Sequence, residues 1–179
     1  MKIAISGAHR TGKTTLVDEL CRALPTYTAV DEPYHLLVEE GHDFPEMPSL
    51  EDFELQLERS IEMVGADEED QIFDRCPADI LAYLISHDDA DDFDVEHWLP
   101  RVRRAMRQLD LVVFVPIEHP DRVTSLERDD ARLRRRVDEE LQEIVLDDRW
   151  EFGVETLVVT GTPRDRARQV LARVRGNED

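Results

Sequence analysis

Short apolar runs alternate with longer amphipathic segments along the chain. Five of the runs have the composition of β-strands: residues 2–6, 26–30, 70–73, 110–115 and 156–160. The remaining segments predict helices over residues 13–24, 34–40, 49–65, 77–87, 94–108, 119–147 (in one or two pieces) and 163–175. Such alternation is typical of parallel sheets. The pattern therefore predicts a three-layer α/β/α fold, in which helices cover both faces of a five-stranded parallel sheet.

Strand composition and helix starts support this prediction. The runs VVFV within residues 110–115 and LVV within 156–160 are apolar without alternation, as strands buried on both faces are. Ser49 begins a Ser-x-x-Asp pattern that predicts a helix start, and Pro77 and Pro163 stand where a first helical turn accepts proline. No internal repeat or low-complexity linker divides the 179 residues, so we expect one domain.

Residues 7–15, GAHRTGKTT, carry the most specific motif of the chain. They fit G-x-x-x-x-G-K-[ST]. In that pattern backbone N–H groups of a glycine-bent loop face phosphate oxygens, the lysine reaches the β- and γ-phosphates, and the hydroxyl binds Mg²⁺. A predicted helix follows and adds the positive end of its dipole. This order favours a nucleotide site over an ordinary glycine turn. The residues expected to bind the nucleotide here are Gly7, Ala8, His9, Arg10, Thr11, Gly12, Lys13, Thr14 and Thr15.

The charge of the chain limits what else it can bind. There are 42 Asp and Glu against 22 Lys and Arg, a formal net charge of −20. Such a charge disfavours binding to a nucleic acid polymer or to an anionic membrane, and solubility is its simplest purpose. Lysine occurs only at Lys2 and Lys13, so a chain that otherwise uses arginine keeps one lysine in the phosphate loop. We expect a small-molecule partner held in a local basic pocket.

The cysteines and the apolar runs indicate the compartment. Cys21 and Cys76 lie far apart and form no C-x-x-C pair, which favours reduced thiols over a disulfide or a zinc site. The N-terminal residues do not resemble a signal peptide, and no apolar run approaches membrane-spanning length. These features predict a cytoplasmic protein.

Missing motifs narrow the class of nucleotide-binding protein. The single asparagine, Asn177, leaves no N-K-x-D motif for reading guanine, which disfavours a GTPase switch. No apolar strand ends in Asp-Glu, as it does in oligomeric ATPase motors, and LSGGQ does not occur. A small chain with a phosphate loop and none of these motifs is most often a phosphotransferase for a small molecule. It would transfer the γ-phosphate of ATP with the help of Mg²⁺.

Ligands of open parallel sheets bind at the carboxyl ends of the strands, where this chain places acidic and basic residues. Asp31 and Glu32 follow the second strand. A carboxylate there can accept the proton of an attacking hydroxyl, but it can equally cap the next helix. We assign Glu32 as the base and Asp31 as the cap, with both beside the acceptor.

Asp74 and Arg75 end the third strand. The aspartate can reach Mg²⁺ through water, and the arginine can hold a donor or acceptor phosphate. The alternative is a structural ion pair between buried side chains.

The segment RDDARLRRR, residues 128–136, gathers positive charge in an acidic chain. Arg128, Arg132 and Arg135 recur at i, i+4 and i+7 and share one helix face, whereas Arg134 and Arg136 are expected to point elsewhere. We predict a mobile lid at about residues 126–140 whose arginines cover the phosphates. Arg128 and Arg132 would act in catalysis and Arg135 in nucleotide binding. The alternative is a solvated helix whose arginines pair with neighbouring acids.

Five stretches together resemble the deoxynucleoside kinase and thymidylate kinase group of P-loop kinases. They are GAHRTGKTT, DEP at 31–33, FELQ at 53–56, FDR at 73–75 and ERDDARLRRRVDEEL at 127–141. GAHRTGKTTL together with FDRCPAD is closer still to the small AAA-like ATP-binding proteins, a group that includes ribosylnicotinamide kinase domains. The resemblance covers nearly the whole chain.

This resemblance implies roles for single residues. In deoxynucleoside kinases the glutamate of the Glu-Pro pair is the base for a 5′-hydroxyl, and the match is Glu32. Their Phe-x-x-Gln places a glutamine on the nucleobase, and the match is Gln56. Residues 74–76, Asp-Arg-Cys, depart from the Glu-Arg-Ser of those enzymes and approach the Asp-Arg of thymidylate kinases. Both a hydroxyl and a monophosphate acceptor therefore stay open.

The segment TGTP at 160–163 resembles the one that holds adenine through its backbone. The resemblance implies that Gly161, Thr162 and Pro163 contact the donor base.

The sequence thus predicts an ATP-dependent kinase of a nucleoside or nucleotide. Two alternatives remain: a kinase of a non-nucleotide small molecule on the same scaffold, and a nucleotide-dependent ATPase with a regulatory role. The residues expected to be catalytic are Lys13, Glu32, Arg75, Arg128 and Arg132. The acceptor is expected to contact Asp31, Glu32, Gln56 and Arg75, and the metal Thr14 and Asp74.

Overall fold

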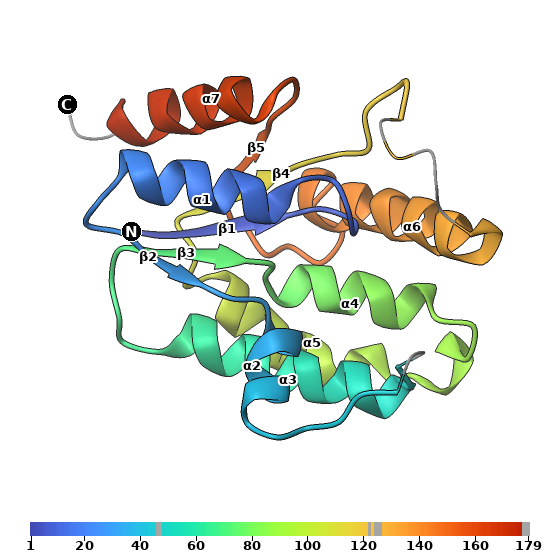
Figure 1. Ribbon diagram of the computed structural model, residues 1–179. Coiled ribbons are helices and arrows are strands. Elements are labelled where there is room, and N and C mark those ends of the chain that lie inside the picture. Colours follow the sequence, from blue (N-terminus) through green and yellow to red (C-terminus); the bar gives the residue numbers. More distant parts are fainter. Residues whose placement is uncertain (46–47, 122, 124–126, 177–179) are drawn as a thin grey trace.

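The computed structural model describes residues 1–176 except 46–47, 122 and 124–126 (Figure 1). Its strands are β1 (Lys2–Ser6), β2 (Thr28–Val30), β3 (Gln71–Asp74), β4 (Leu111–Phe114) and β5 (Thr156–Val158). Its α-helices are α1 (Lys13–Ala23), α2 (Pro33–Glu39), α3 (Leu50–Gly65), α4 (Pro77–Ser86), α5 (Val95–Met106), α6 (Arg128–Leu141) and α7 (Pro163–Arg175). A 3₁₀ turn, η1 (Ala90–Asp92), precedes α5, and a π-helical turn, η2 (Gln142–Leu146), extends α6.

The five strands form one parallel sheet in the order β2-β3-β1-β4-β5. The first strand lies in the middle, where Ile3 is paired with Ile72 of β3 on one side and Leu111 of β4 on the other. The loop that follows β1 therefore emerges at the centre of the carboxyl edge. Residues after β2 and β3 emerge beside it, which brings the predicted site residues to one edge of the sheet.

Alternate residues of the strands face two apolar layers. Ile3 and Ile5 of β1 pack with residues of α1 and α7, whereas Ala4 packs with residues of α3 to α6. Figure 1 shows the same division, with α1 and α7 on one face of the sheet and the other helices across it. The predicted three-layer α/β/α fold with a five-stranded parallel sheet is confirmed.

Capping explains where several helices begin. Ser49 Oγ accepts the N–H of Asp52 over 3.2 Å, and the Asp52 carboxylate accepts the N–H of Ser49 over 2.9 Å, so the predicted start of α3 is confirmed. Pro77 and Pro163 occupy the first turns of α4 and α7, as predicted.

Two local predictions are wrong. Asp31 does not cap α2: the helix begins at Pro33, one residue before the expected start, so Glu32 takes the N-cap position, and no side chain among the described residues bonds the first turn. The helix expected from residue 119 begins only at Arg128. Pro120 lacks an N–H group and disfavours a helical conformation in the residue before it, so the described residues between 119 and 127 form a loop. Residue 126, where the predicted lid begins, lies outside the described residues.

Within the part of the chain that the structure describes, no helix combines the length and the apolar character that a membrane span requires.

Candidate functional site

The loop between β1 and α1 owes its shape to two glycines. At Gly7 a Cβ atom would lie 2.4 Å from the carbonyl oxygen of Val115, and the φ angle there is +150°. At Gly12, the N-cap of α1, φ is +92°, a left-handed conformation that favours glycine. The motif glycines are therefore required by a close approach to β4 and by the turn into the helix.

The carbonyl oxygens of this loop bond to cationic side chains from different parts of the fold. The pairs are Gly7 with Arg75 (3.4 Å), Ala8 with Lys13 (2.9 Å), His9 with Arg134 (2.8 Å) and Thr11 with Arg166 (2.6 Å). Arg134 lies on α6 and Arg166 on α7, and both are buried. Because a peptide's carbonyl and N–H point in opposite directions, these four bonds favour a loop whose N–H groups face inward.

The helix that follows presents an uncapped N-terminus. No side chain among the described residues bonds its first N–H groups, and its first turn contains no acidic residue. Unsatisfied N–H groups and the positive end of the helix dipole together form an anion site. The loop and the start of α1 therefore fit the phosphates of a nucleotide.

A hydroxyl and a carboxylate lie side by side at the edge of this loop. Thr14 Oγ1 donates to Asp74 Oδ2 over 2.5 Å. Asp74 is 5% exposed, and its second oxygen, Oδ1, is buried without a hydrogen-bond partner among the described residues. Burial raises the pKa of the Asp74 carboxyl, although Thr14 and nearby cations oppose this. An unpartnered carboxylate oxygen beside a hydroxyl is a donor set that suits Mg²⁺.

This pair is smaller than a dedicated metal centre. Among the residues that the structure describes, no group of three or more His, Cys, Asp and Glu side chains is arranged to hold a metal ion. Mg²⁺ commonly takes one or two protein ligands and completes its shell with water and substrate phosphates. Thr14 and Asp74 fit that pattern.

Lys13 is the cation that the loop motif predicts to contact the phosphates. Its side chain is 5% exposed, and its Nζ donates to the carbonyl of Ala8. Burial, helped by the nearby Arg75, lowers the pKa of Lys13 to about 7. Negative phosphate oxygens would reverse this effect, because an opposite charge favours the protonated amine.

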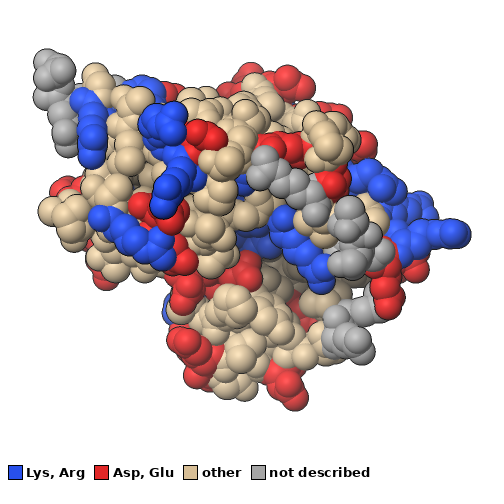
Figure 2. Space-filling model, turned by 45° about the horizontal axis from the view of Figure 1, so that its top comes forward, with Lys and Arg blue, Asp and Glu red and all other residues tan. Residues whose placement is uncertain are grey.

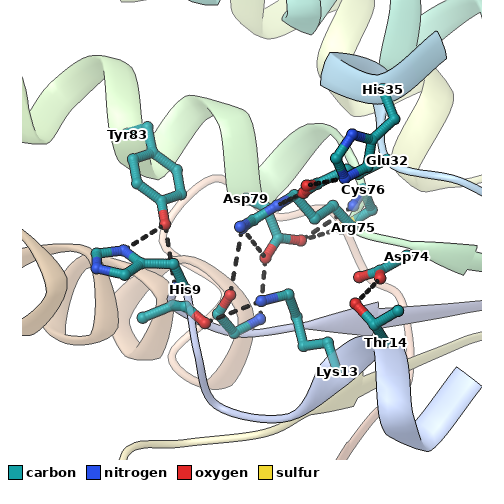
Figure 3. A network of polar contacts seen from close by, with 12 residues as sticks. His9, Lys13, Thr14, Glu32, His35, Asp74, Arg75, Cys76, Asp79 and Tyr83 are labelled. Atoms are coloured by element: carbon teal, nitrogen blue, oxygen red, sulfur yellow. Dashed lines mark hydrogen bonds and ion pairs between the residues drawn. The ribbon is translucent and has the colours of Figure 1, made fainter. Parts of the chain in front are cut away.

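Glu32 and Arg75 form an ion pair on the other side of the loop (Figure 3). Arg75 Nε donates to Glu32 Oε2, and His35 Nε2 lies 3.2 Å from Glu32 Oε1. Arg75 has a φ angle of +80°, an uncommon conformation for a residue with a side chain. The structure thus brings Glu32 and Arg75 together and leaves Asp31 exposed at the surface.

Charges around this pair set its protonation. Burial alone would raise the pKa of Glu32, but Arg75, Lys13 and His35 together outweigh it, so the net pKa lies below its usual value. Burial would lower the pKa of Arg75, but Tyr83, Glu32 and Asp79 raise it. Glu32 is therefore a carboxylate at neutral pH, and Arg75 is a cation.

Asp79 holds the base of the loop from α4. Its side chain is fully buried; Oδ1 accepts the N–H of Gly7 over 2.9 Å and Oδ2 accepts the N–H of Cys76 over 3.0 Å. Arg75 Nη1 lies 4.0 Å from Oδ1. The carboxylate thereby joins the start of the loop to the start of α4.

A cleft of about 210 Å³ opens beside the loop on the side of α7. Its lining includes Thr15, Pro116 and Pro163, together with the buried Arg134 and Arg166. Of the TGTP segment, only Pro163 is among the described residues that line the cleft.

Two backbone N–H groups of the TGTP segment already form hydrogen bonds within the protein. The N–H of Gly161 donates to Glu118 over 2.6 Å, and the N–H of Thr162 donates to Asp165 over 3.2 Å. These two N–H groups are engaged within the protein, so a base bound here would have to use other groups.

The arginines of α6 divide into two sides. Arg128, Arg132 and Arg135 are exposed, and Figure 2 shows Lys and Arg side chains gathered over this end of the molecule. Arg134 is 3% exposed and reaches both the His9 carbonyl and Asp121. As expected, Arg134 points away from the face of these three arginines, but its own face is the one that meets the phosphate loop. At 100° per residue, Arg134 lies about 130° around the helix from the centre of the exposed stripe.

Gln56 lies one helical turn after Phe53 on α3 and is 5% exposed. Its Nε2 donates to the Asp52 carbonyl over 3.3 Å, and its Oε1 has no partner among the described residues. Phe53 stacks on Tyr83 of α4, with ring centroids 5.6 Å apart. The Gln56 amide can therefore form further hydrogen bonds, and it lies near the stacked rings of Phe53 and Tyr83.

Reading the sequence missed four residues of this network: Arg134, Arg166, Asp79 and Tyr83. A signal existed for two of them. Asp79 stands three residues after Cys76 with Pro77 between them, a helix-start pattern. Arg134 recurs with Val137 and Leu141 at i, i+3 and i+7, the spacing of a buried face.

Comparisons with known proteins agree with this architecture. A family model described as an AAA domain matches residues 2–166. No curated protein sequence matches the chain. Among solved structures, deoxyadenosine kinase from M. mycoides with bound dATP is similar, with a TM-score of 0.66 and 15% identity over 98% of this chain and 99% of that one.

Shikimate kinase from Aquifex aeolicus is similar with a TM-score of 0.59 and 17% identity, over 99% of this chain and 98% of that one. NadR protein in complex with NR gives a TM-score of 0.64 and 18% identity over 98% of this chain, which spans 50% of NadR. Identities this low identify the fold alone. The fold is that of P-loop kinases, as the sequence motifs predict.

Proposed function

Since the chain belongs to the family of AAA domains and has the fold of P-loop kinases, we propose that it transfers the γ-phosphate of ATP to a hydroxyl group of a small molecule, most simply a nucleoside. One observation carries the proposal: the carbonyl groups of the phosphate loop are bonded to Lys13 and three arginines, next to an uncapped helix start. That arrangement suits a polyphosphate.

Residues on the donor side would hold and neutralise the phosphates. The first N–H groups of α1 and the Lys13 ammonium would contact the β- and γ-phosphates. Thr14 and Asp74 would hold Mg²⁺, which neutralises charge on the phosphates during transfer. The cleft beside Thr15 and Pro163 would take the adenine ring.

Residues on the acceptor side would orient and deprotonate the hydroxyl. The acceptor oxygen attacks the γ-phosphorus, the bond from that phosphorus to the β,γ-bridging oxygen breaks, and ADP leaves. Each carboxylate oxygen has two lone pairs, so Glu32 can accept the hydroxyl proton while it stays paired with Arg75. Arg75 fixes the orientation of this carboxylate and keeps it ionised.

The charge balance favours a hydroxyl acceptor over a phosphate acceptor. Glu32 and the buried Asp79 flank Arg75, whose guanidinium is already paired with Glu32. A monophosphate would bring about two negative charges and compete with Glu32 for Arg75. The exposed Asp31 adds a further negative charge nearby. A neutral hydroxyl meets none of this repulsion.

A nucleoside is supported by two features of α3. Gln56 keeps its amide oxygen and one amide hydrogen available, which suits bidentate contact with a base edge. Phe53 and Tyr83 form a stacked aromatic pair in the same region, and flat rings favour such surfaces.

Helix α6 would act as the lid through the side that faces the loop. Arg134 lines the cleft and touches the loop, so it is the arginine of α6 that is placed to reach the donor. Arg128, Arg132 and Arg135 face solvent in this structure. Their catalytic and nucleotide-binding roles stay predictions that would require α6 to turn toward the phosphates.

The proposed function is tested with a panel of hydroxyl acceptors, monophosphates and non-nucleotide small molecules. ADP release and mass spectrometry of the products are read for the unaltered protein and for Lys13→Ala. We expect ADP release to rise strongly with one hydroxyl compound and the product to be its phosphate ester. ATP consumption that no acceptor accelerates would favour a regulatory ATPase instead and overturn the proposal.

A further inference from the structure

His9 lies between two helices that meet at the phosphate loop. Its ring points away from Lys13 (Figure 3), and its side chain is 20% exposed. Nε2 lies 2.7 Å from Asp130 Oδ1 on α6. Nδ1 lies 3.0 Å from Tyr83 Oη on α4, and the backbone N–H of His9 donates to the same oxygen over 3.1 Å. One loop residue therefore contacts the lid helix and a helix of the acceptor side.

The contacts of His9 select one protonation state. Tyr83 Oη accepts the backbone N–H, so its own hydrogen is left to donate to Nδ1. Nε2 then carries the ring proton and faces the Asp130 carboxylate. Burial lowers the pKa of His9, and the cations Arg75, Arg134 and Lys13 lower it further, while Asp130 opposes them. The neutral Nε2–H tautomer satisfies the contact with Tyr83 and places its N–H toward Asp130; this second approach is electrostatic, because it lacks hydrogen-bond geometry.

Tyr83 carries the connection to the acceptor side. Its ring is nearly buried, at 8% exposure, and the guanidinium carbon of Arg75 lies 5.2 Å from the ring centroid. Arg75 in turn pairs with Glu32. A shift of the Tyr83 ring would therefore change the surface on which Arg75 rests, and with it the direction of the Glu32 carboxylate.

The lid helix touches His9 at two points. Asp130 and Arg134 are four residues apart on α6 and share a face. Asp130 approaches the ring, and Arg134 Nε donates to the His9 carbonyl over 2.8 Å. The neighbouring Asp129 is exposed and makes no such contact within the described part of the chain. A movement of α6 would therefore change both contacts of this loop residue.

We infer that His9 is a positioning residue of the reaction: it ties α6 to Tyr83, and through Tyr83 to the Arg75–Glu32 pair, so that docking of α6 over the donor and the geometry at the acceptor are set together. This inference rests on the proposed function. It assigns the third residue of the loop a role in coupling the two substrates, in addition to any contact with phosphate.

The test is hydrogen–deuterium exchange with and without Mg²⁺ and the ATP analogue AMP-PNP. In the unaltered protein, the analogue should slow exchange in the loop, in α6 and in α4. In Asp130→Asn, loop protection should persist, whereas the additional protection of α4 should fall about 2- to 30-fold, the range of typical coupling effects. Asp129→Asn is the matched control and should behave as the unaltered protein.

A second variant and a spectroscopic measurement separate positioning from stability. Tyr83→Phe keeps the stacked ring but removes the hydroxyl, and it should uncouple α4 as Asp130→Asn does. Nitrogen-15 spectra of the His9 ring, identified with His9→Gln, should show the Nε2–H tautomer in the unaltered protein and lose this preference in Tyr83→Phe.

The outcomes are distinguishable. Failure of the unaltered protein to bind AMP-PNP would overturn the proposed function and this inference with it. Binding with equal α4 protection in Asp130→Asn, Tyr83→Phe and Asp129→Asn would overturn the inference alone. So would an Nδ1–H tautomer, or an equal loss of protection in loop, α6 and α4, which indicates a purely structural role.

Discussion

Replacing Arg134 by alanine should destabilise the protein far more than replacing Arg136, two residues further along the same helix. Arg134 is 3% exposed and donates to both the His9 carbonyl and Asp121. Within the described part of the chain, Arg136 pairs only with Asp88, whose side chain is 91% exposed, over 3.2 Å. The comparison keeps the residue type, the helix and the substitution constant, and changes burial and partners.

The expected magnitudes differ clearly. A hydrogen bond to a charged group contributes about 1.5–3 kcal/mol, and Arg134→Ala leaves the His9 carbonyl and the Asp121 carboxylate without this partner. An exposed ion pair contributes about 0–1 kcal/mol, which is the expected cost of Arg136→Ala. In a chain of this size 1 kcal/mol shifts the melting temperature by about 2–4 °C. Arg134→Ala should therefore lower it by roughly 3–12 °C through loss of the bond to the His9 carbonyl alone, and Arg136→Ala by at most about 4 °C.

Melting temperatures from circular dichroism and unfolding free energies from urea titration measure the difference. Affinity for AMP-PNP, measured by calorimetry, should also fall in Arg134→Ala, because the carbonyl of His9 is then free to turn. Equal destabilisation by both substitutions, or a cost below about 0.5 kcal/mol for Arg134→Ala, would refute the view that α6 is anchored on the loop.

Three further predictions follow from the same site. Glu32→Gln should slow transfer by about 10²–10⁴-fold with little change in AMP-PNP affinity, measured by steady-state kinetics and calorimetry; normal turnover would exclude Glu32 as the base. The pKa of Glu32 lies below its usual 4.5 in the folded protein. Its ionised carboxylate therefore stabilises the protein above about pH 4.5, and this stabilisation is lost as the pH falls through the lowered pKa. Below that pKa, the melting temperatures of Glu32→Gln and the unaltered protein should converge. Gly7→Ala should cost about 1–3 kcal/mol or more, because its Cβ would meet the Val115 carbonyl, whereas Gly65→Ala has open space and should be neutral or slightly stabilising in a urea titration.

Local sequence patterns predict the strands and helices of this fold, because the bonds that form these elements join residues close together in the chain. The strand Lys2–Ser6 and the start of α7 at Pro163 coincide with the expected bounds. The loop motif predicts its own shape, since the positions of Gly7 and Gly12 are required by backbone conformation and by the approach of Val115. The order of strands and helices then implies a parallel sheet and a site at its carboxyl edge.

Contacts between distant elements escape such patterns. Helical spacing shows that Arg128, Arg132 and Arg135 share a face, but it does not show which face meets the loop. Apolar residues decide that point, because Val137 and Leu141 bury the side that carries Arg134. The spacing of Val137 and Leu141 therefore predicts the side of α6 that packs on the loop, whereas the number of arginines does not.

The roles of Asp31 and Glu32 depend on a similar choice. Either residue could precede a helix, and the outcome depends on where Pro33 starts it. Glu32 occupies the N-cap position, yet its carboxylate turns to Arg75, which is 43 residues away in sequence. A charge partner that is close only in the folded state cannot be read from local sequence.

The bonds to the loop carbonyls have a consequence for the thermodynamics of ligand binding. The four cations come from α1, α6, α7 and the residue that follows β3, so the loop is ordered before any phosphate arrives. Binding then loses little backbone entropy, because the ordering has already occurred during folding. Ligand-binding loops commonly open at low free energy, independently of the core. Here, opening requires breaking contacts with several elements at once, so competence to bind should disappear only as the whole structure unfolds.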